Sequence, residues 1–249
     1  MAGDSNGGLL ADLVDEARRL IDAGRAQGLT LRVVGGVAVY LQSPDCQPLL
    51  PRTLKDIGLV TPRGDGKRIG KLLEEHGYIG DDMFNALRGS RRQLFVDPVN
   101  KRQLDVFVGE FSMCHSLPIA DRLDRDPYTV PLAELLLTKL QILELNERDE
   151  RDIYTICFHH ELGAGGIESE VIAGLCASDW GLWRTCQGTI ERCLADVAGY
   201  GLGPGEADVI ARRLQGLSDE LDRAPKSNKW KRRNRVGDRV RWYQEPEEV

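Results

Sequence analysis

The sequence predicts an α/β (α+β) fold, in which a small sheet with flanking helices is followed by a helical C-terminal region. Two observations lead to this prediction. Short apolar segments of β type occur only in the first 130 residues, at 31–34, 55–60, 93–96 and 103–108. After Pro131 the apolar residues recur at helical spacing, with glycine-rich breaks between the pieces.

The first elements follow from apolar spacing and from turn residues. Leucine and alanine at helical spacing predict a helix over 9–26. The strand at 31–34 runs directly into Gly35-Gly36, after which Val37 begins a short helix. The strand at 55–60 is followed by a turn and by a helix over 67–76.

The remaining strands form a predicted hairpin, and the rest of the chain is helical. The segments 93–96 and 103–108 are separated by Asp97-Pro98-Val99-Asn100, which is rich in turn formers. Helices are predicted at 132–146, 149–159, 167–176, 180–197 and 207–221. These elements divide the chain into an α/β core (1–130), a helical region (131–222) and a basic, aromatic tail (223–249) that we expect to be flexible.

The composition excludes several classes of protein. Of 249 residues, 41% are hydrophobic and 29% are charged, as in ordinary globular proteins. No apolar run is long enough to cross a bilayer, and the first residues do not resemble a secretory signal. We therefore expect a cytoplasmic protein with no membrane partner. The six cysteines form no C-x-x-C pair, so a zinc site is not expected.

The charge is unevenly distributed along the chain. The segment 223–241 holds nine basic residues and one acid, whereas the other residues hold 24 basic and 38 acidic groups. Trp230, Trp242 and Tyr243 lie among these cations. Basic and aromatic residues together are typical of proteins that bind single-stranded nucleic acid. A tail that docks on an acidic body, or that only aids solubility, has the same composition.

Two lone acids in apolar strands predict a metal site. Asp56 lies in the strand 55–60, and Asp105 lies in the strand 103–108. A carboxylate on a largely buried sheet is costly unless it is paired or binds a metal. Two such residues on neighbouring strands would form a pocket for Mg²⁺, which prefers oxygen ligands and often keeps phosphates in its shell.

The turn at Gly35-Gly36 suits a phosphate. Glycine allows a tight turn and a close approach of an anion to the backbone. The helix that follows offers free N–H groups and the positive end of its dipole. A glycine pair after a strand is a weak signal alone, but the two strand aspartates downstream favour the functional interpretation.

These motifs resemble a known family. The runs Val33-Val34-Gly35-Gly36-Val37-Ala38 and Arg52-Thr53-Leu54-Lys55-Asp56 are similar to the nucleotidyltransferase superfamily of the DNA polymerase β type. The similarity is greatest to its AbiEii/AbiGii toxin-like and minimal nucleotidyltransferase group, and it covers roughly residues 10–160. It implies a mixed sheet flanked by helices, Mg²⁺ or Mn²⁺, and transfer of a nucleoside monophosphate from an NTP to a hydroxyl.

The resemblance also implies roles for individual residues. Asp56 and Asp105 would bind the metal, and Asp105 would help to activate the attacking hydroxyl. The residues expected to contact the nucleotide are Gly35, Gly36, Arg52, Thr53 and Lys139. Relatives act on protein, on tRNA and on small antibiotics, so an RNA or protein acceptor and an antitoxin partner are both expected candidates.

Gly58 departs from the family pattern, which has a second metal-binding Asp at this position. Two-metal catalysis holds its ions roughly 3.5–4 Å apart and needs carboxylates to do so. Three alternatives remain open: one metal suffices, another acid such as Asp97 substitutes, or the site does not catalyse. The last would make the chain a pseudo-enzyme that binds nucleotide, RNA or a partner protein. An Asp introduced at position 58 is expected to restore the missing ligand.

Lys139 lies on the apolar stripe of its predicted helix, between leucine and isoleucine residues at helical spacing. A lysine in this position must either extend to solvent or meet an anion. The resemblance favours a catalytic role close to the nucleotide. Asp149 and Asp152 follow in the pattern Asp-x-x-Asp, which the toxin-like proteins share and which a solvated helix face would also explain.

Overall fold

The structure is a computed structural model that describes residues 8–46 and 49–245, and the chain divides into two compact units. The first, which we call the α/β unit, contains the described residues up to Leu41 together with Thr53–Phe111 and Leu117–Pro131. The second, which we call the helical unit, contains Gln42–Arg52, Ser112–Ser116 and the residues from Leu132 onward.

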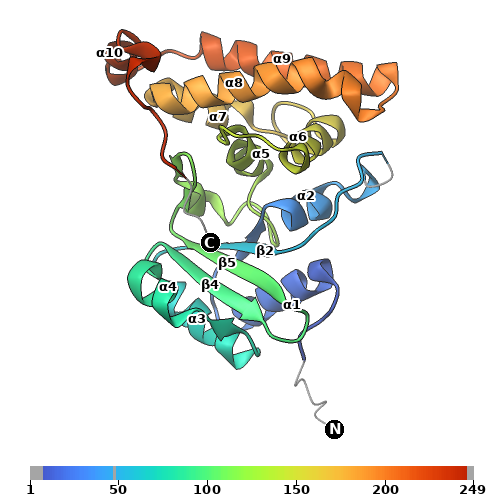
Figure 1. Cartoon of the computed structure of the whole chain (residues 1–249), viewed down its shortest axis with the longest axis vertical. Helices are drawn as coiled ribbons and strands as arrows, with labels where there is room; N and C mark the ends of the chain where they lie inside the picture. Colours follow the sequence, from blue (N-terminus) through green and yellow to red (C-terminus); the bar gives the residue numbers. More distant parts are fainter. Residues whose placement is uncertain (1–7, 47–48, 246–249) are drawn as a thin grey trace. The chain divides into compact units, whose positions relative to one another are not determined.

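A five-stranded mixed sheet forms the centre of the α/β unit (Figure 1). In spatial order its strands are β1 (Arg32–Val34), β2 (Ile57–Thr61), β5 (Arg102–Val108), β4 (Arg92–Asp97) and β3 (Ile79–Gly80). β2 and β5 are parallel, and the other neighbouring pairs are antiparallel. The predicted mixed α+β architecture is therefore confirmed.

The hairpin of β4 and β5 forms as predicted. Asp97 stabilises its turn by accepting hydrogen bonds from the backbone N–H groups of Val99 and Asn100. Strand β2 begins later than predicted, at Ile57, so Asp56 precedes the strand. The sequence did not predict β3 or α4 (Asp82–Arg88). Helix α4 is only seven residues long, and Met83, Phe84 and Leu87 are too few apolar residues to establish a helical period.

The two faces of the sheet differ in what covers them. Helices α1 (Leu13–Ala26) and α3 (Gly66–Glu75) pack together. A Cβ atom at Gly70 of α3 would lie 3.8 Å from Phe95 Cζ, so α3 covers the face that carries Phe95. Because side chains alternate along a strand, Gly58 and Asp105 lie together on the opposite face.

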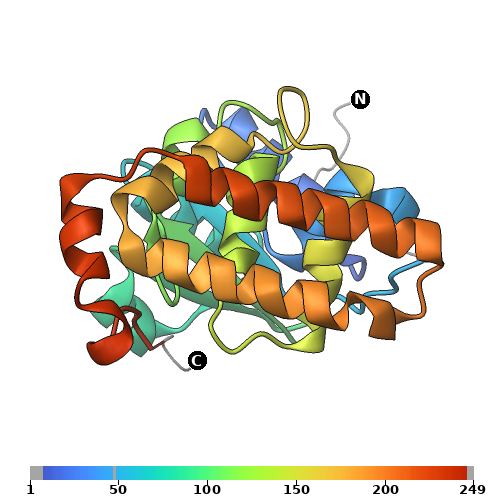
Figure 2. The same ribbon diagram turned by 90° about the horizontal axis from the view of Figure 1, so that it is seen from above.

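The helical unit contains the elements predicted after Pro131. They are α5 (Leu132–Leu140), α6 (Glu147–His159), α7 (Ser169–Ser178), α8 (Trp180–Asp196) and α9 (Pro204–Arg223). The long helices α8 and α9 pack side by side (Figure 2). Helix α5 ends earlier than predicted, at Leu140. Asn146 caps the start of α6, because its side chain accepts hydrogen bonds from two backbone N–H groups.

The described part of the basic segment folds onto the helical unit, whereas the sequence suggested a flexible tail. Residues Asn228–Asn234 form α10, whose Ser227 cap accepts the backbone N–H of Trp230. The Trp230 side chain is buried, and α10 packs on α7 and α8. Within the described ranges, no helix combines the length and the apolar character that a membrane crossing requires.

Candidate functional site

The Gly35-Gly36 turn lies where β1 ends and α2 (Gly36–Gln42) begins. Gly35 adopts a positive φ of 76°, a backbone conformation that favours glycine. The first helical hydrogen bond runs from Val39 N–H to the Gly35 carbonyl. The N–H groups of the first turn precede this bond and have no intrahelical acceptor, which is the arrangement that binds anions at helix N-termini.

Asp56 lies at the same end of the sheet as this turn. The last residue pair between β1 and β2 joins Val34 to Gly58, so Gly35 follows directly and Asp56 lies two residues before Gly58. The Asp56 side chain is exposed, and it forms no hydrogen bond or ion pair within residues 8–46 and 49–245. The expectation of a buried Asp56 is therefore wrong, but its free carboxylate can accept a cation from solvent.

Gly58 is packed closely against β1. A Cβ atom at this position would lie 3.0 Å from Val34 Cγ1 and 3.2 Å from the Val34 carbonyl oxygen. A larger residue requires Val34 to shift by a few tenths of an ångström. The gain of a metal ligand in Gly58→Asp stays a prediction, and this shift is a cost that the sequence did not reveal.

Asp105 is buried and already paired within the protein. Arg92 Nε and one of its terminal nitrogens each lie 2.8 Å from Asp105 Oδ1, and Gln103 donates a hydrogen bond of 2.9 Å to Oδ2. The guanidinium also lies over the Phe107 ring, 5.3 Å from its centroid. Burial of Asp105 thus needs no metal to explain it, and Arg92 would have to withdraw before Asp105 Oδ1 could bind a cation.

Asp97, considered as a substitute ligand, has a structural role in the hairpin. Its carboxylate accepts hydrogen bonds from Val99 and Asn100 and forms an ion pair of 2.9 Å with Arg102. Burial alone would raise the pKa of Asp97, but these hydrogen bonds and the Arg102 charge hold it below its ordinary value. The side chain is fully buried and not available to a metal.

In the helical unit, Lys139 joins a buried cluster of charges. Its Nζ lies 2.9 Å from Asp149 Oδ1 and 2.8 Å from Asp152 Oδ2. Arg52 Nε lies 3.0 Å from Asp152 Oδ1. We call Arg52, Lys139, Asp149 and Asp152 the charge cluster. The sequence left two alternatives for Lys139, extension to solvent or contact with an anion, and the two aspartates of the Asp-x-x-Asp pattern supply the anion.

The electrostatic balance of the charge cluster favours a protonated lysine. Burial alone would lower the pKa of Lys139, but the carboxylates of Asp152 and Asp149 outweigh it and raise this pKa above its ordinary value. Lys139 and Arg52 are therefore held by protein anions, and neither is a free cation waiting for a phosphate. Thr53, the other residue expected to contact nucleotide, is exposed in the α/β unit.

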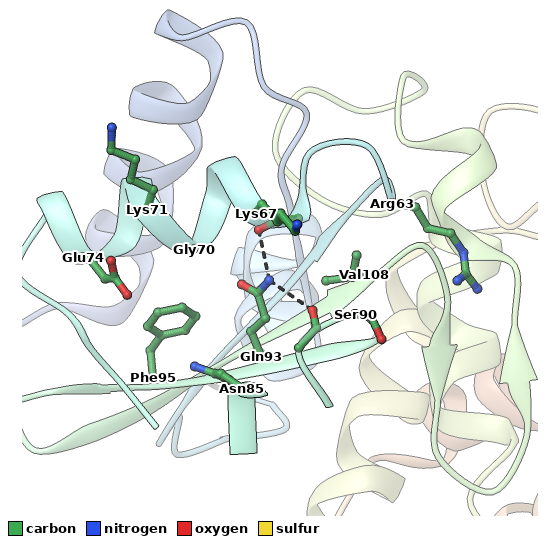
Figure 3. A pocket seen from close by; sticks show the side chains of 12 residues that line it. Arg63, Lys67, Gly70, Lys71, Glu74, Asn85, Ser90, Gln93, Phe95 and Val108 are labelled. Carbon is green, nitrogen blue, oxygen red and sulfur yellow. Dashed lines mark hydrogen bonds between the residues drawn. The ribbon is translucent and has the colours of Figure 1, made fainter. Parts of the chain in front are cut away.

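A second concave surface in the α/β unit was not predicted from the sequence. It has a volume of about 580 Å³ and lies on the α3 side of the sheet, between α3 and β4 (Figure 3). Gly66 and Gly70, four residues apart on α3, let the helix approach the sheet closely, since a Cβ atom would lie 2.8 Å from Val108 Cγ1 at Gly66 and 3.1 Å from Gln93 Oε1 at Gly70. The Gln93 Nε2 donates to the Gly66 and Gly89 carbonyls. The paired glycines on an amphipathic helix were the only signal of this pocket.

A single Mg²⁺ complexed with a nucleotide fits the residues on the Asp56 face better than a two-metal centre does. Mg²⁺ that retains waters and phosphate oxygens needs only one or two carboxylates. Asp56 can supply one, and Asp105 can supply another only by leaving Arg92. Within the described residues, no group of three or more His, Cys, Asp or Glu side chains could hold a metal.

Comparison with models of known protein families and with curated protein sequences finds no match.

Proposed function

We propose that this chain is a nucleotidyltransferase-like protein that binds the Mg²⁺ complex of an NTP at the Gly35-Gly36 turn and transfers a nucleoside monophosphate to a hydroxyl. The observation that carries the proposal is Asp56, an exposed carboxylate without a partner among the described residues, beside a strand-to-helix turn. The turn would hold phosphate oxygens through backbone N–H groups, and Asp56 would hold the cation.

Catalysis in such a site depends on positioning and on electrostatics. The acceptor oxygen bonds to the α-phosphorus as the bond to the bridging oxygen breaks, and pyrophosphate leaves. The bound cation would neutralise charge on the phosphates. Asp105 can receive the proton of the acceptor hydroxyl only if Arg92 releases it, so we expect slow transfer. The acceptor would be RNA, a protein or a small molecule, and a toxin-like role with an antitoxin partner belongs to the same proposal.

A second candidate is a pseudo-enzyme that binds nucleotide, RNA or a partner protein without transfer. Two contacts favour it: the close packing of Gly58 on Val34, and the ion pair between Arg92 and Asp105. Both remove carboxylate ligands from the face that carries Asp56. Nucleotide binding is common to the two candidates, and only transfer separates them.

Asp56→Asn is expected to weaken binding of the Mg²⁺–NTP complex about tenfold or more, because a hard cation loses an anionic ligand. The matched control is Asp82→Asn, which removes another exposed aspartate of the α/β unit without a partner in the described residues. Isothermal titration of each variant with the four NTPs, with and without Mg²⁺, measures the effect.

The same proteins should then be incubated with α-labelled NTP and cell extract. Label that is transferred by the unchanged protein and lost in Asp56→Asn supports the transferase. Binding without transfer favours the pseudo-enzyme. Equal affinities of the Asp56 and Asp82 variants for the Mg²⁺–NTP complex would show that Asp56 does not bind the cation.

A further inference from the structure

The basic segment and α8 together form a pocket within the helical unit. Its volume is about 590 Å³. We call it the basic aromatic surface, and the side chains on which the argument depends are Trp180, Lys229, Arg232, Arg233, Trp242 and Tyr243. The composition of this segment alone is compatible with nucleic-acid binding, with docking on the acidic remainder of the chain and with a role only in solubility.

Aromatic rings hold the segment in place. Trp242 packs edge to face on Trp180, with 5.9 Å between ring centroids, and its Nε1 donates to Thr185 Oγ1. Tyr243 continues the series at 5.6 Å from Trp242. Trp242 and Tyr243 remain half-buried, so part of each ring is open to solvent. Rings in this position can stack with flat groups of a ligand.

Part of the positive charge of the segment takes part in this docking, because the Arg233 guanidinium lies over the Trp180 ring, 4.6 Å from its centroid. Arg184 of α8 pairs with Asp238, but that ion pair uses the one acid of the segment, not its cations. Five exposed cations form no side-chain interaction anywhere in the described ranges: Lys229, Lys231, Arg232, Arg235 and Arg239. Tryptophan packing, the contact of Arg233 with Trp180 and the ion pair of Asp238 therefore attach the segment, and the charge of the five cations is available to a partner.

A buried donor within the surface also lacks an acceptor. Trp230 is 8% exposed, and its Nε1 has no hydrogen-bond partner in the described part of the chain. An unpaired buried N–H is costly in a folded protein. Trp230 is one of the residues that line the pocket.

We propose that the basic aromatic surface binds single-stranded nucleic acid. Unpaired bases offer flat rings to Trp242 and Tyr243, and the phosphates offer negative charge to the free lysines and arginines. Duplexes hide their rings within the stack, and acidic proteins lack a regular series of rings. The surface belongs to the helical unit and its test needs no NTP, so this inference is independent of the proposed transferase.

The test is fluorescence anisotropy of the full chain with a labelled single-stranded oligoribonucleotide of about 16 nucleotides, over a range of salt concentrations. The double variant Lys229→Ala, Arg232→Ala should bind more weakly. The slope of its log affinity against log salt concentration should be shallower by about 1.4, since each lost phosphate contact reduces the slope by about 0.7. The matched control, Arg18→Ala with Arg91→Ala, removes two exposed cations of the α/β unit.

A second variant separates stacking from charge. Trp242→Ala should weaken binding about tenfold, whereas Trp242→Phe should retain most of the affinity because a ring remains. The proposal is supported if binding is salt-dependent, if it is weakened by the double variant and by Trp242→Ala, and if the control variant keeps it. Three results would overturn it: no binding at low salt, an equal loss in the control, or equal competition by duplex RNA, polyglutamate or anionic vesicles.

Discussion

Replacing Lys139 with Met is expected to lower the free energy of unfolding of the helical unit by about 3–5 kcal/mol. Lys139 neutralises Asp149 and Asp152, and both carboxylates are buried. Without it, Arg52 still contacts Asp152, but Asp149 has lost its partner at the centre of the cluster. Denaturation in urea, followed by circular dichroism, measures the change.

Three comparisons make this prediction specific. Arg151→Met breaks an ion pair with exposed Glu147, and it should cost less than about 0.5 kcal/mol. Adding Asp149→Leu to Lys139→Met should recover part of the loss, because it removes the unpaired carboxylate. A Lys139→Met protein as stable as the unchanged chain would show that the cluster does not stabilise the fold.

The same lysine gives a pH dependence whose sign follows from its raised pKa. The folded state binds the proton more tightly than the unfolded chain, so the contribution is fully present below the ordinary lysine pKa of 10.5. It is lost as the pH rises through the higher folded value. The stability difference between the unchanged chain and Lys139→Met should therefore stay constant near neutral pH and narrow in strong alkali.

Replacing Trp230 with Ala is expected to detach α10, at a cost of about 3–5 kcal/mol in docking free energy. The indole is buried and packs edge to face on Trp183, with 5.1 Å between centroids. Trp230→Phe should keep most of the contact, and Val240→Ala, at an exposed position, should have no effect. Limited proteolysis and hydrogen exchange of α10 measure the outcome, and unchanged protection in Trp230→Ala would contradict it.

The fold was largely predictable because strands, glycine turns and helical periods are local signals. The hairpin of β4 and β5 is an example, since Asp97 and Asn100 mark its turn in the sequence. The same hairpin also allows a contact to be predicted that the sequence analysis did not include, the ion pair of Arg92 with Asp105. Its register pairs Arg92 with Phe107, which places Arg92 diagonally across from Asp105 on the same face, and that ion pair removes the need for a metal.

The environment of the candidate site depends on pairings that no local pattern specifies. Gly58 lies against Val34 because β1 and β2 pair across an intervening helix and loop, and the sequence gives no register for such a pair. Asp56 is exposed because β2 begins one residue after it. Lys139 was correctly expected to meet an anion, but the choice between phosphate and aspartate depended on how α5 and α6 pack.

We propose that a metal–nucleotide complex binds where β1 ends and β2 begins. Paramagnetic broadening of backbone amide signals, with Mn²⁺ in place of Mg²⁺ and a non-hydrolysable NTP analogue, locates the complex. We expect broadening centred on Gly35, Gly36 and Asp56 that requires both metal and nucleotide. Broadening centred on Gln93 and Phe95 on the opposite face of the sheet, or in the helical unit, would contradict it, as would its absence.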